Sequence, residues 1–201
     1  MGILPMNIHG RDARATAHFS GQVATMRWIW IDKFIEFESG RRAVAVKNLT
    51  MAEEHLHDHF PGYPIMPASL IIEGMAQTAG ILVGQAHHFE EKVILAKVRR
   101  AVFRDYAVPG DRLRYEATIE STDPRDPVPR TGCATCGRVF RNDEPEPLGE
   151  IDIVFSHIDR NMSGLDFPEE NFVFTDEFKA LLRSYQVGDL SSGTGGRTGD
   201  A

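Results

Sequence analysis

Two polar residues stand out because their types and surroundings suit them to moving protons. His59 begins a loop in which three prolines and a glycine follow it, and these residues restrict the backbone that carries the imidazole. Glu73 lies further along the chain, in a stretch of small and apolar residues. A neutral imidazole is a competent base near pH 7, and a protonated carboxyl group is a competent acid. The two residues therefore form a candidate acid–base pair.

The stretch around Glu73 predicts one long helix, from Ala68 to about His87. Pro67 stands before it, as suits the first turn of a helix, and the stretch is apolar or small on nearly every side, which predicts burial. Gln77 follows Glu73 by four residues, so both should share one face. A buried glutamate has a plain structural alternative, an ion pair with a basic residue of a strand, and the residues alone leave both readings open.

Segments in which polar and apolar residues alternate flank this helix and predict strands over residues 28–39, 42–49, 93–104, 112–122, 134–142 and 148–157. Gly40 and the run Pro109-Gly110-Asp111 are turn signals. Residues 176–185 predict a short amphipathic helix. The pattern indicates an α+β fold in which an antiparallel β-sheet packs on one central helix.

The residues around His59 and Glu73 resemble those of the FabZ-type (3R)-hydroxyacyl-acyl-carrier-protein dehydratases. The resemblance is carried by His59-Phe60-Pro61-Gly62-x-Pro64-x-x-Pro67, Glu73-x-x-Ala76-Gln77 and Val108-Pro109-Gly110-Asp111. It covers roughly residues 26–157. It implies a hotdog fold, with the sheet wrapped around the long helix, and a homodimer whose two active sites lie at the interface. Trimers of dimers, that is homohexamers, are the further assembly that it suggests.

The resemblance also implies a role for each site residue. His59 of one subunit would remove the α-proton of a (3R)-hydroxyacyl thioester, and Glu73 of the other would protonate the departing hydroxyl group. The N–H of Ala68 would bind the thioester carbonyl, and the carbonyl of Ile65 would fix the tautomer of His59. The remaining residues expected to bind substrate are Phe60, Gly62 and Gln77. The product would be a trans-2-enoyl thioester of fatty acid biosynthesis, formed without a metal or other cofactor.

The substrate would arrive on the phosphopantetheine arm of acyl carrier protein, an acidic partner. The formal net charge of −7 argues against nucleic-acid binding, for which a broad basic surface is expected. An acidic partner would therefore need a local basic patch. The candidate patch consists of Lys97, Arg99, Arg100 and Arg104. It is either a landing site for the carrier protein or a solvated strand face.

Two other functions stay open at this point. An acyl thioesterase, another hotdog activity, would need a carboxylate that activates water. A non-catalytic acyl-binding or scaffold subunit is favoured by Asp58 and Ala68, which stand where the family usually has glycine. The His59/Glu73 pair favours catalysis. The resemblance further implies dehydration without isomerisation, because the related FabA-type enzymes, which also isomerise, carry aspartate where this chain has Glu73.

The predicted organisation has four parts: a disordered N-terminal extension over 1–25, the hotdog domain over 26–160, a C-terminal extension with a short helix over 161–186, and a disordered tail over 187–201. No apolar run approaches the roughly 20 residues that cross a bilayer, and no secretory signal is evident, so a cytoplasmic protein is expected. The alternating histidines of the run HLHDH and the pair Cys133-x-x-Cys136 are weak metal signals, and ordinary loop histidines and reduced thiols are expected instead.

Overall fold

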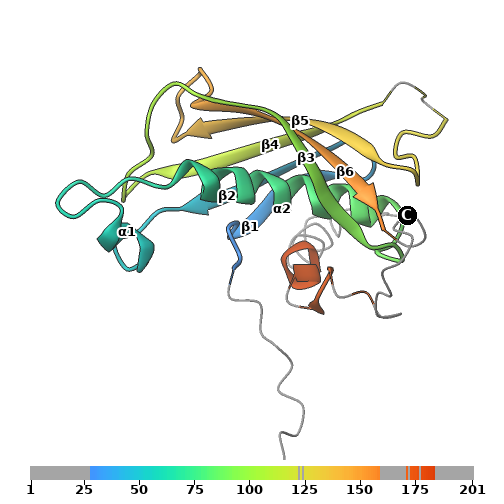
Figure 1. Cartoon of the computed structure of the whole chain (residues 1–201), viewed down its shortest axis with the longest axis horizontal. Coiled ribbons are helices and arrows are strands. Elements are labelled where there is room, and N and C mark those ends of the chain that lie inside the picture. The colour runs from blue at the N-terminus through green and yellow to red at the C-terminus, as the bar shows by residue number, and fades with distance from the viewer. Residues whose placement is uncertain are drawn as a thin grey trace, which may run out of the picture.

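A computed structural model describes residues 28–121, 123, 125–158, 171, 173–176 and 178–183. One antiparallel sheet curves over one long helix (Figure 1). The strands are β1 (Lys33–Glu38), β2 (Arg42–Asn48), β3 (Val93–Phe103), β4 (Arg112–Glu120), β5 (Cys133–Arg141) and β6 (Gly149–His157), and the helices are α1 (His55–Asp58) and α2 (Ala68–Ala86). The strand order is β1-β2-β4-β5-β6-β3. This is the hotdog architecture that the sequence predicts.

Helix α2 packs closely on the sheet because small residues stand at its points of contact. A Cβ atom on Gly74 would lie 2.6 Å from the ring of Tyr115 on β4, and one on Gly137 of β5 would lie 2.6 Å from the sulfur of Met75 on α2. Burial raises the pKa of Tyr115, so its hydroxyl group stays protonated. Gly74, which lowers the helix propensity of α2, thus lets the helix and the sheet approach each other.

Two predicted elements differ from those observed. The first strand begins at Lys33 rather than at Trp28, because the backbone at Trp28 and Trp30 bonds to the side chain of Gln77 on α2 instead of to a strand. The run HLHDH, whose histidines are expected in a loop, contains the short helix α1, so its alternating histidines do not share one face. Among the described residues, no group of three or more His, Cys, Asp or Glu side chains could hold a metal ion.

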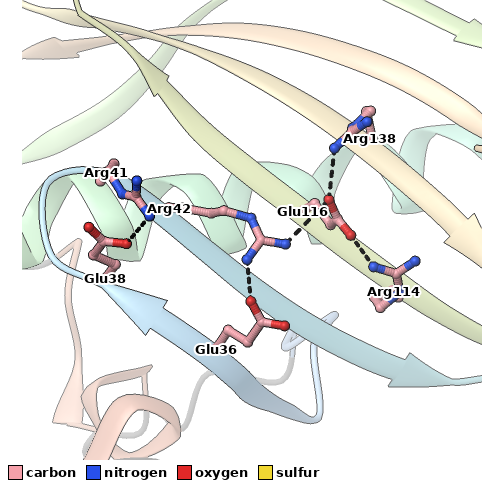
Figure 2. Close-up of polar contacts among 7 residues, drawn as sticks. All are labelled: Glu36, Glu38, Arg41, Arg42, Arg114, Glu116 and Arg138. Carbon is pink, nitrogen blue, oxygen red and sulfur yellow. Dashed lines mark hydrogen bonds and ion pairs between the residues drawn. The ribbon is translucent and has the colours of Figure 1, made fainter.

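The face of the sheet turned away from α2 carries a network of ion pairs centred on Glu116 of β4 (Figure 2). Glu116 is only 7% exposed and contacts Arg114, Arg138 at 3.1 Å and Arg42 at 3.4 Å. Arg42 also pairs with Glu36 of β1. The network therefore joins side chains of the four neighbouring strands β1, β2, β4 and β5.

The opposite edge of the sheet is formed by β3, which is exposed along most of its length. Its exposed side chains include Leu95, Val98 and Val102. None of the helices in the described part of the chain combines the length and apolar character that crossing a membrane requires. The extensions predicted over 1–25 and 187–201 lie outside the described residues, as do residues 159–170.

Candidate active site

The loop between α1 and α2 holds His59 through backbone hydrogen bonds. Phe60 and Tyr63 exchange two of them, at 3.0 and 2.9 Å, around a turn in which Gly62 has a φ of +76°. The N–H of Ile65 donates to the carbonyl of His59 at 2.8 Å. The imidazole also stacks on the ring of Phe60, with 4.2 Å between centroids. The loop therefore fixes both the backbone and the ring of His59.

The second contact of His59 sets which ring nitrogen carries the proton. Its Nδ1 lies 3.0 Å from the carbonyl oxygen of Ile65. A carbonyl oxygen only accepts hydrogen bonds, so Nδ1 of the neutral ring must be the donor and Nε2 keeps its lone pair. This is the contact with Ile65 that the resemblance implies, and it leaves Nε2 as the basic atom.

His59 opens onto a cavity of about 480 Å³, called here the His59 hollow. Phe60, Ile65 and Ala68 also line it, while Gly62 does not. Ala68 is the first residue of α2, and the first four N–H groups of a helix have no partner within the helix. A donor for a developing negative charge thus lies at the same cavity as the imidazole base.

Glu73 is exposed in the single chain, so the prediction that it is buried is wrong for the chain on its own. Its side chain accepts a hydrogen bond from Nε2 of Gln77 at 3.0 Å, the contact expected for two residues on one helix face. No basic side chain of the described residues forms an ion pair with Glu73. The structural alternative, an ion pair with a strand arginine or lysine, is therefore not observed in this part of the chain. The carboxylate remains accessible.

Gln77 uses both ends of its amide group within the protein. Its Oε1 accepts from the N–H of Trp30 at 2.7 Å, and its Nε2 donates to the carbonyl of Trp28 at 2.6 Å as well as to Glu73. Gln77 is itself buried. Its observed contacts are those of a residue that orients Glu73 and anchors the segment before β1.

His59 and Glu73 line different cavities of the single chain. Glu73 borders a second cavity of about 460 Å³, the Glu73 hollow, together with Ala76, Gln77 and Gly80 of α2. The His59 hollow lies at the N-terminal end of the same helix. One chain therefore does not bring His59 and Glu73 together at one cavity.

The predicted basic patch is largely paired with carboxylates. Arg99 contacts Glu120 at 2.6 Å, and Arg100 and Arg104 both pair with Glu150 on β6. These side chains are partly exposed, so the pairs contribute little to stability and leave the cations open to competing partners. Arg104 alone among the four patch residues, which include Lys97, lines the His59 hollow.

The chain resembles known proteins over most of its described part. Residues 24–144 match the FabA-like domain. The chain is 35% identical to the 3-hydroxyacyl-[acyl-carrier-protein] dehydratase FabZ of Bacillus pumilus over 130 residues, which are 64% of this chain and 85% of that protein. The FabZ of Pelotomaculum thermopropionicum is 42% identical over 94 residues, 46% of this chain and 67% of that one. This chain is a FabZ-type member of the FabA-like family.

The fold of this FabZ-type protein also has a counterpart among solved structures. It aligns with the dehydratase heterocomplex ApeI:P from Xenorhabdus doucetiae with a TM-score of 0.52, over 66% of this chain and 85% of that one. The identity is 14%, so the likeness concerns the fold alone.

Several residues that line the two cavities of the FabZ-type chain are not evident from its motifs. Tyr106 and Asp105, which follow β3, border the His59 hollow. Trp28 and three residues of the C-terminal segment, Val173, Phe174 and Phe178, border the Glu73 hollow. The C-terminal residues lie beyond the family match at 24–144. Phe178 falls in the last predicted helix, of which residues 176 and 178–183 are observed as helical, whereas Val173 and Phe174 precede that helix and have no sequence signal.

Proposed function

We propose that this protein dehydrates (3R)-hydroxyacyl thioesters carried on acyl carrier protein to trans-2-enoyl thioesters, with His59 as base and Glu73 as acid. The observation that carries the proposal is the hydrogen bond between His59 Nδ1 and the carbonyl of Ile65, because it leaves Nε2 as a base beside the free N–H groups at the start of α2. FabZ-type family membership supplies the reaction class.

In the proposed reaction, Nε2 of His59 takes the α-proton of the substrate. The electron pair of that C–H bond moves toward the thioester carbonyl, whose oxygen gains negative charge, and the N–H of Ala68 donates to this oxygen. The electrons then form the α–β double bond as the β-hydroxyl group departs. Glu73 donates the proton that converts the hydroxyl group into water. His59 then releases its proton to solvent and Glu73 takes one up, which restores both groups to their starting protonation states.

The acid in each site is proposed to come from a second copy of the chain. His59 and Glu73 line different hollows of one chain, so a complete pair requires two half-sites to face each other. The exposed edge strand β3 supports this assembly, because an edge with free backbone groups and apolar side chains is a surface suited to pairing. A two-fold dimer through β3 would contain two equal sites. Further assembly into trimers of dimers is the extension of this proposal.

The carrier protein is proposed to bind near the mouth of the His59 hollow. Arg104 lines that hollow, and its guanidinium pairs with Glu150 at 3.3 Å in a partly exposed position. A carboxylate or phosphate of the carrier could replace that partner without burying an unpaired charge. Arg99, Arg100 and Lys97 continue the basic surface along β3.

The proposal is tested with 3-hydroxybutyryl thioester as substrate, following the enoyl absorbance in the ultraviolet. His59→Ala and Glu73→Gln should each lower kcat by about 10²–10⁴-fold, the range expected for loss of one acid or base. Turnover that survives both substitutions would contradict the assignment. Release of free thiol would indicate a thioesterase instead, and wild-type protein that binds acyl thioesters without turnover would indicate a scaffold.

A mixing experiment tests whether the site spans two chains. Equal amounts of the His59→Ala and Glu73→Gln proteins are combined, and the subunits are allowed to exchange. In each mixed dimer one site carries both substitutions and the other carries neither, so random exchange should restore roughly a quarter of the wild-type rate. Each variant mixed with itself serves as the control. No recovery after demonstrated exchange would contradict a shared site.

A further inference from the structure

The C-terminal segment of the described chain is attached to the end of α2 through Asn171. The side-chain amide of Asn171 donates to the carbonyls of Phe89 at 2.9 Å and Glu91 at 3.0 Å. Its oxygen accepts from the N–H groups of Val173 at 3.1 Å and Phe174 at 3.2 Å. All polar positions of the Asn171 side chain therefore serve to hold this segment against the connection between α2 and β3.

Phe174 occupies a space on α2 that exists because residue 84 is glycine. A Cβ atom on Gly84 would lie 2.3 Å from the ring of Phe174. The ring is buried and also contacts Phe89, with 5.0 Å between centroids. The helix surface and the C-terminal segment are thus shaped to fit each other.

The same segment forms part of the wall of the Glu73 hollow. Val173, Phe174 and Phe178 line this cavity together with Glu73, and the helix also contributes Ala76, Gln77 and Gly80 to its lining. Glu73, Gly80 and Gly84 lie along one side of α2, at spacings of seven and four residues. From Glu73 to Gly84 the helix rises about 16 Å. Glu73 and Phe174 thus border the same cavity, and Phe174 packs on α2 at Gly84, beyond the proposed acid along the helix.

We propose that Val173, Phe174 and Phe178 form the end wall of the acyl-chain pocket and limit the length of the substrate that this protein accepts. The inference rests on the proposed function, because it assigns the acyl chain to the cavity beside Glu73. Each methylene group that enters an apolar cavity strengthens binding about fourfold, and the gain ends where the chain meets a wall. Residues outside the family match at 24–144 would then set the acyl-chain length that this family member prefers.

The test compares kcat/KM for 3-hydroxybutyryl, 3-hydroxyoctanoyl and 3-hydroxypalmitoyl thioesters on the carrier protein. Phe174→Ala and Phe178→Ala should each raise the ratio of palmitoyl to butyryl turnover by at least about tenfold, because removal of a ring admits further methylene groups. Val173→Phe should do the reverse and lower the octanoyl-to-butyryl ratio. Ratios that stay at the wild-type value in all three variants would overturn the proposal.

Leu182→Ala is the matched control. Leu182 is a buried residue of the same segment, but it does not line the Glu73 hollow. Its truncation should lower stability and leave the chain-length ratios unchanged. A shift as large as that of Phe174→Ala would mean that loosening the segment, rather than removing its wall, is responsible, and would overturn the assignment to single side chains.

A binding measurement separates this inference from the proposed function. Butyryl turnover by wild-type protein tests dehydration alone. Calorimetry with palmitoyl-pantetheine, in which the thioester is replaced by an amide, tests the wall without any turnover, and Phe174→Ala should bind this probe at least about tenfold more tightly than wild type. Equal affinity of Phe174→Ala and wild type for the probe would overturn the proposed end wall even if the enzyme is active. Tighter binding by Phe174→Ala would support the end wall even if no dehydration is seen.

Discussion

At the scale of single residues, Gln77 determines the position of the proposed acid. Gln77→Met keeps the length of the side chain and removes its bonds to Glu73 and to the backbone of Trp28 and Trp30. The buried N–H of Trp30 then lacks an acceptor, so the free energy of unfolding should fall by about 1–3 kcal/mol. Because Glu73 also loses its orienting contact, kcat should fall more than KM rises. Urea denaturation and steady-state kinetics measure the two effects.

Gln85 offers a control on the same helix. Its Oε1 accepts only an exposed hydrogen bond from Ser39, at 2.5 Å. Gln85→Met should change the free energy of unfolding and kcat little, since exposed hydrogen bonds exchange readily with water. If Gln77→Met lost stability but kept wild-type kcat, Gln77 would be a structural anchor with no positioning role.

His55 makes the stability of the fold depend on pH. Burial lowers the pKa of His55 below its usual 6.5, and its ring packs edge-on against Trp30, 5.1 Å between centroids, with Nε2 3.3 Å from the sulfur of Met66. Glu53 opposes the shift, whereas Lys47 and His59 add to it. The unfolded chain therefore binds the proton first as pH falls through 6.5, and the stabilisation present above that pH is lost below it.

The corresponding measurement is Tm against pH between 7.5 and 5, values chosen to bracket the ordinary histidine pKa of about 6.5. The Tm of His55→Gln should fall less on acidification than that of wild type. His57→Gln removes an exposed histidine from the same short helix and should keep the wild-type slope. Parallel curves for wild type and His55→Gln would contradict the role of His55.

At the scale of elements, two glycines of α2 should respond to alanine in opposite ways. Alanine favours a helix by about 1 kcal/mol over glycine. At Gly74 the new methyl group would lie 2.6 Å from the ring of Tyr115 and 3.1 Å from the backbone oxygen of Trp30, so Gly74→Ala should lower stability by about 1–3 kcal/mol. At Gly80 the nearest atom, in Phe155, is 3.4 Å away, and Gly80→Ala should be neutral or stabilising.

Thermal unfolding of the two variants beside wild type checks this contrast. A Gly74→Ala protein as stable as Gly80→Ala would mean that Tyr115 can move aside. The contact between helix and sheet would then be looser than the distances indicate.

Helix α2 also shows what a sequence can and cannot predict. Its bounds follow from local features, Pro67 at one end and the end of the apolar run at the other, and the observed helix, Ala68–Ala86, ends one residue before the prediction. The exposure of Glu73 was missed because it depends on what lies opposite the residue, which is set by contacts far apart in the chain. The same holds for β1, which starts late because Gln77 binds the backbone before it.

The candidate site divides along the same line. The loop of His59 is predictable, because its prolines and Gly62 restrict the backbone locally and the motif identifies the family. That His59 and Glu73 line separate hollows is not contained in their spacing. Nor is the approach of Phe174 to Gly84, two residues that no local pattern connects.

At the scale of the whole molecule, the two edges of the sheet differ in a way that favours one of them for assembly. The outward positions of β1 carry Lys33, Glu36 and Glu38, and both glutamates pair with arginines (Figure 2). Charged side chains at an edge discourage pairing with another strand. The edge formed by β3 also carries basic side chains, but it is a longer strand and exposes the apolar side chains of Leu95, Val98 and Val102. The proposed dimer would therefore form through β3.

This reasoning predicts the effect of a charge at the middle of β3. Val98 is the central residue of the strand, so two-fold pairing of β3 about its midpoint would bring the two copies of Val98 near each other. Val98→Glu would then place like charges across the pair, and the dimer dissociation constant should rise at least about tenfold. Val98 is 37% exposed, and Val108, in the turn after β3, is 38% exposed, which makes Val108→Glu a control of equal charge and exposure.

Sedimentation over a range of concentrations measures the dissociation constants of wild type, Val98→Glu and Val108→Glu, and butyryl turnover is followed over the same range. Because each proposed site needs two chains, the activity of Val98→Glu per chain should fall on dilution as its dimers dissociate, while Val108→Glu should match wild type. Activity per chain that stays constant while dimers dissociate would mean that a single chain carries a complete site, and would refute the shared arrangement of His59 and Glu73.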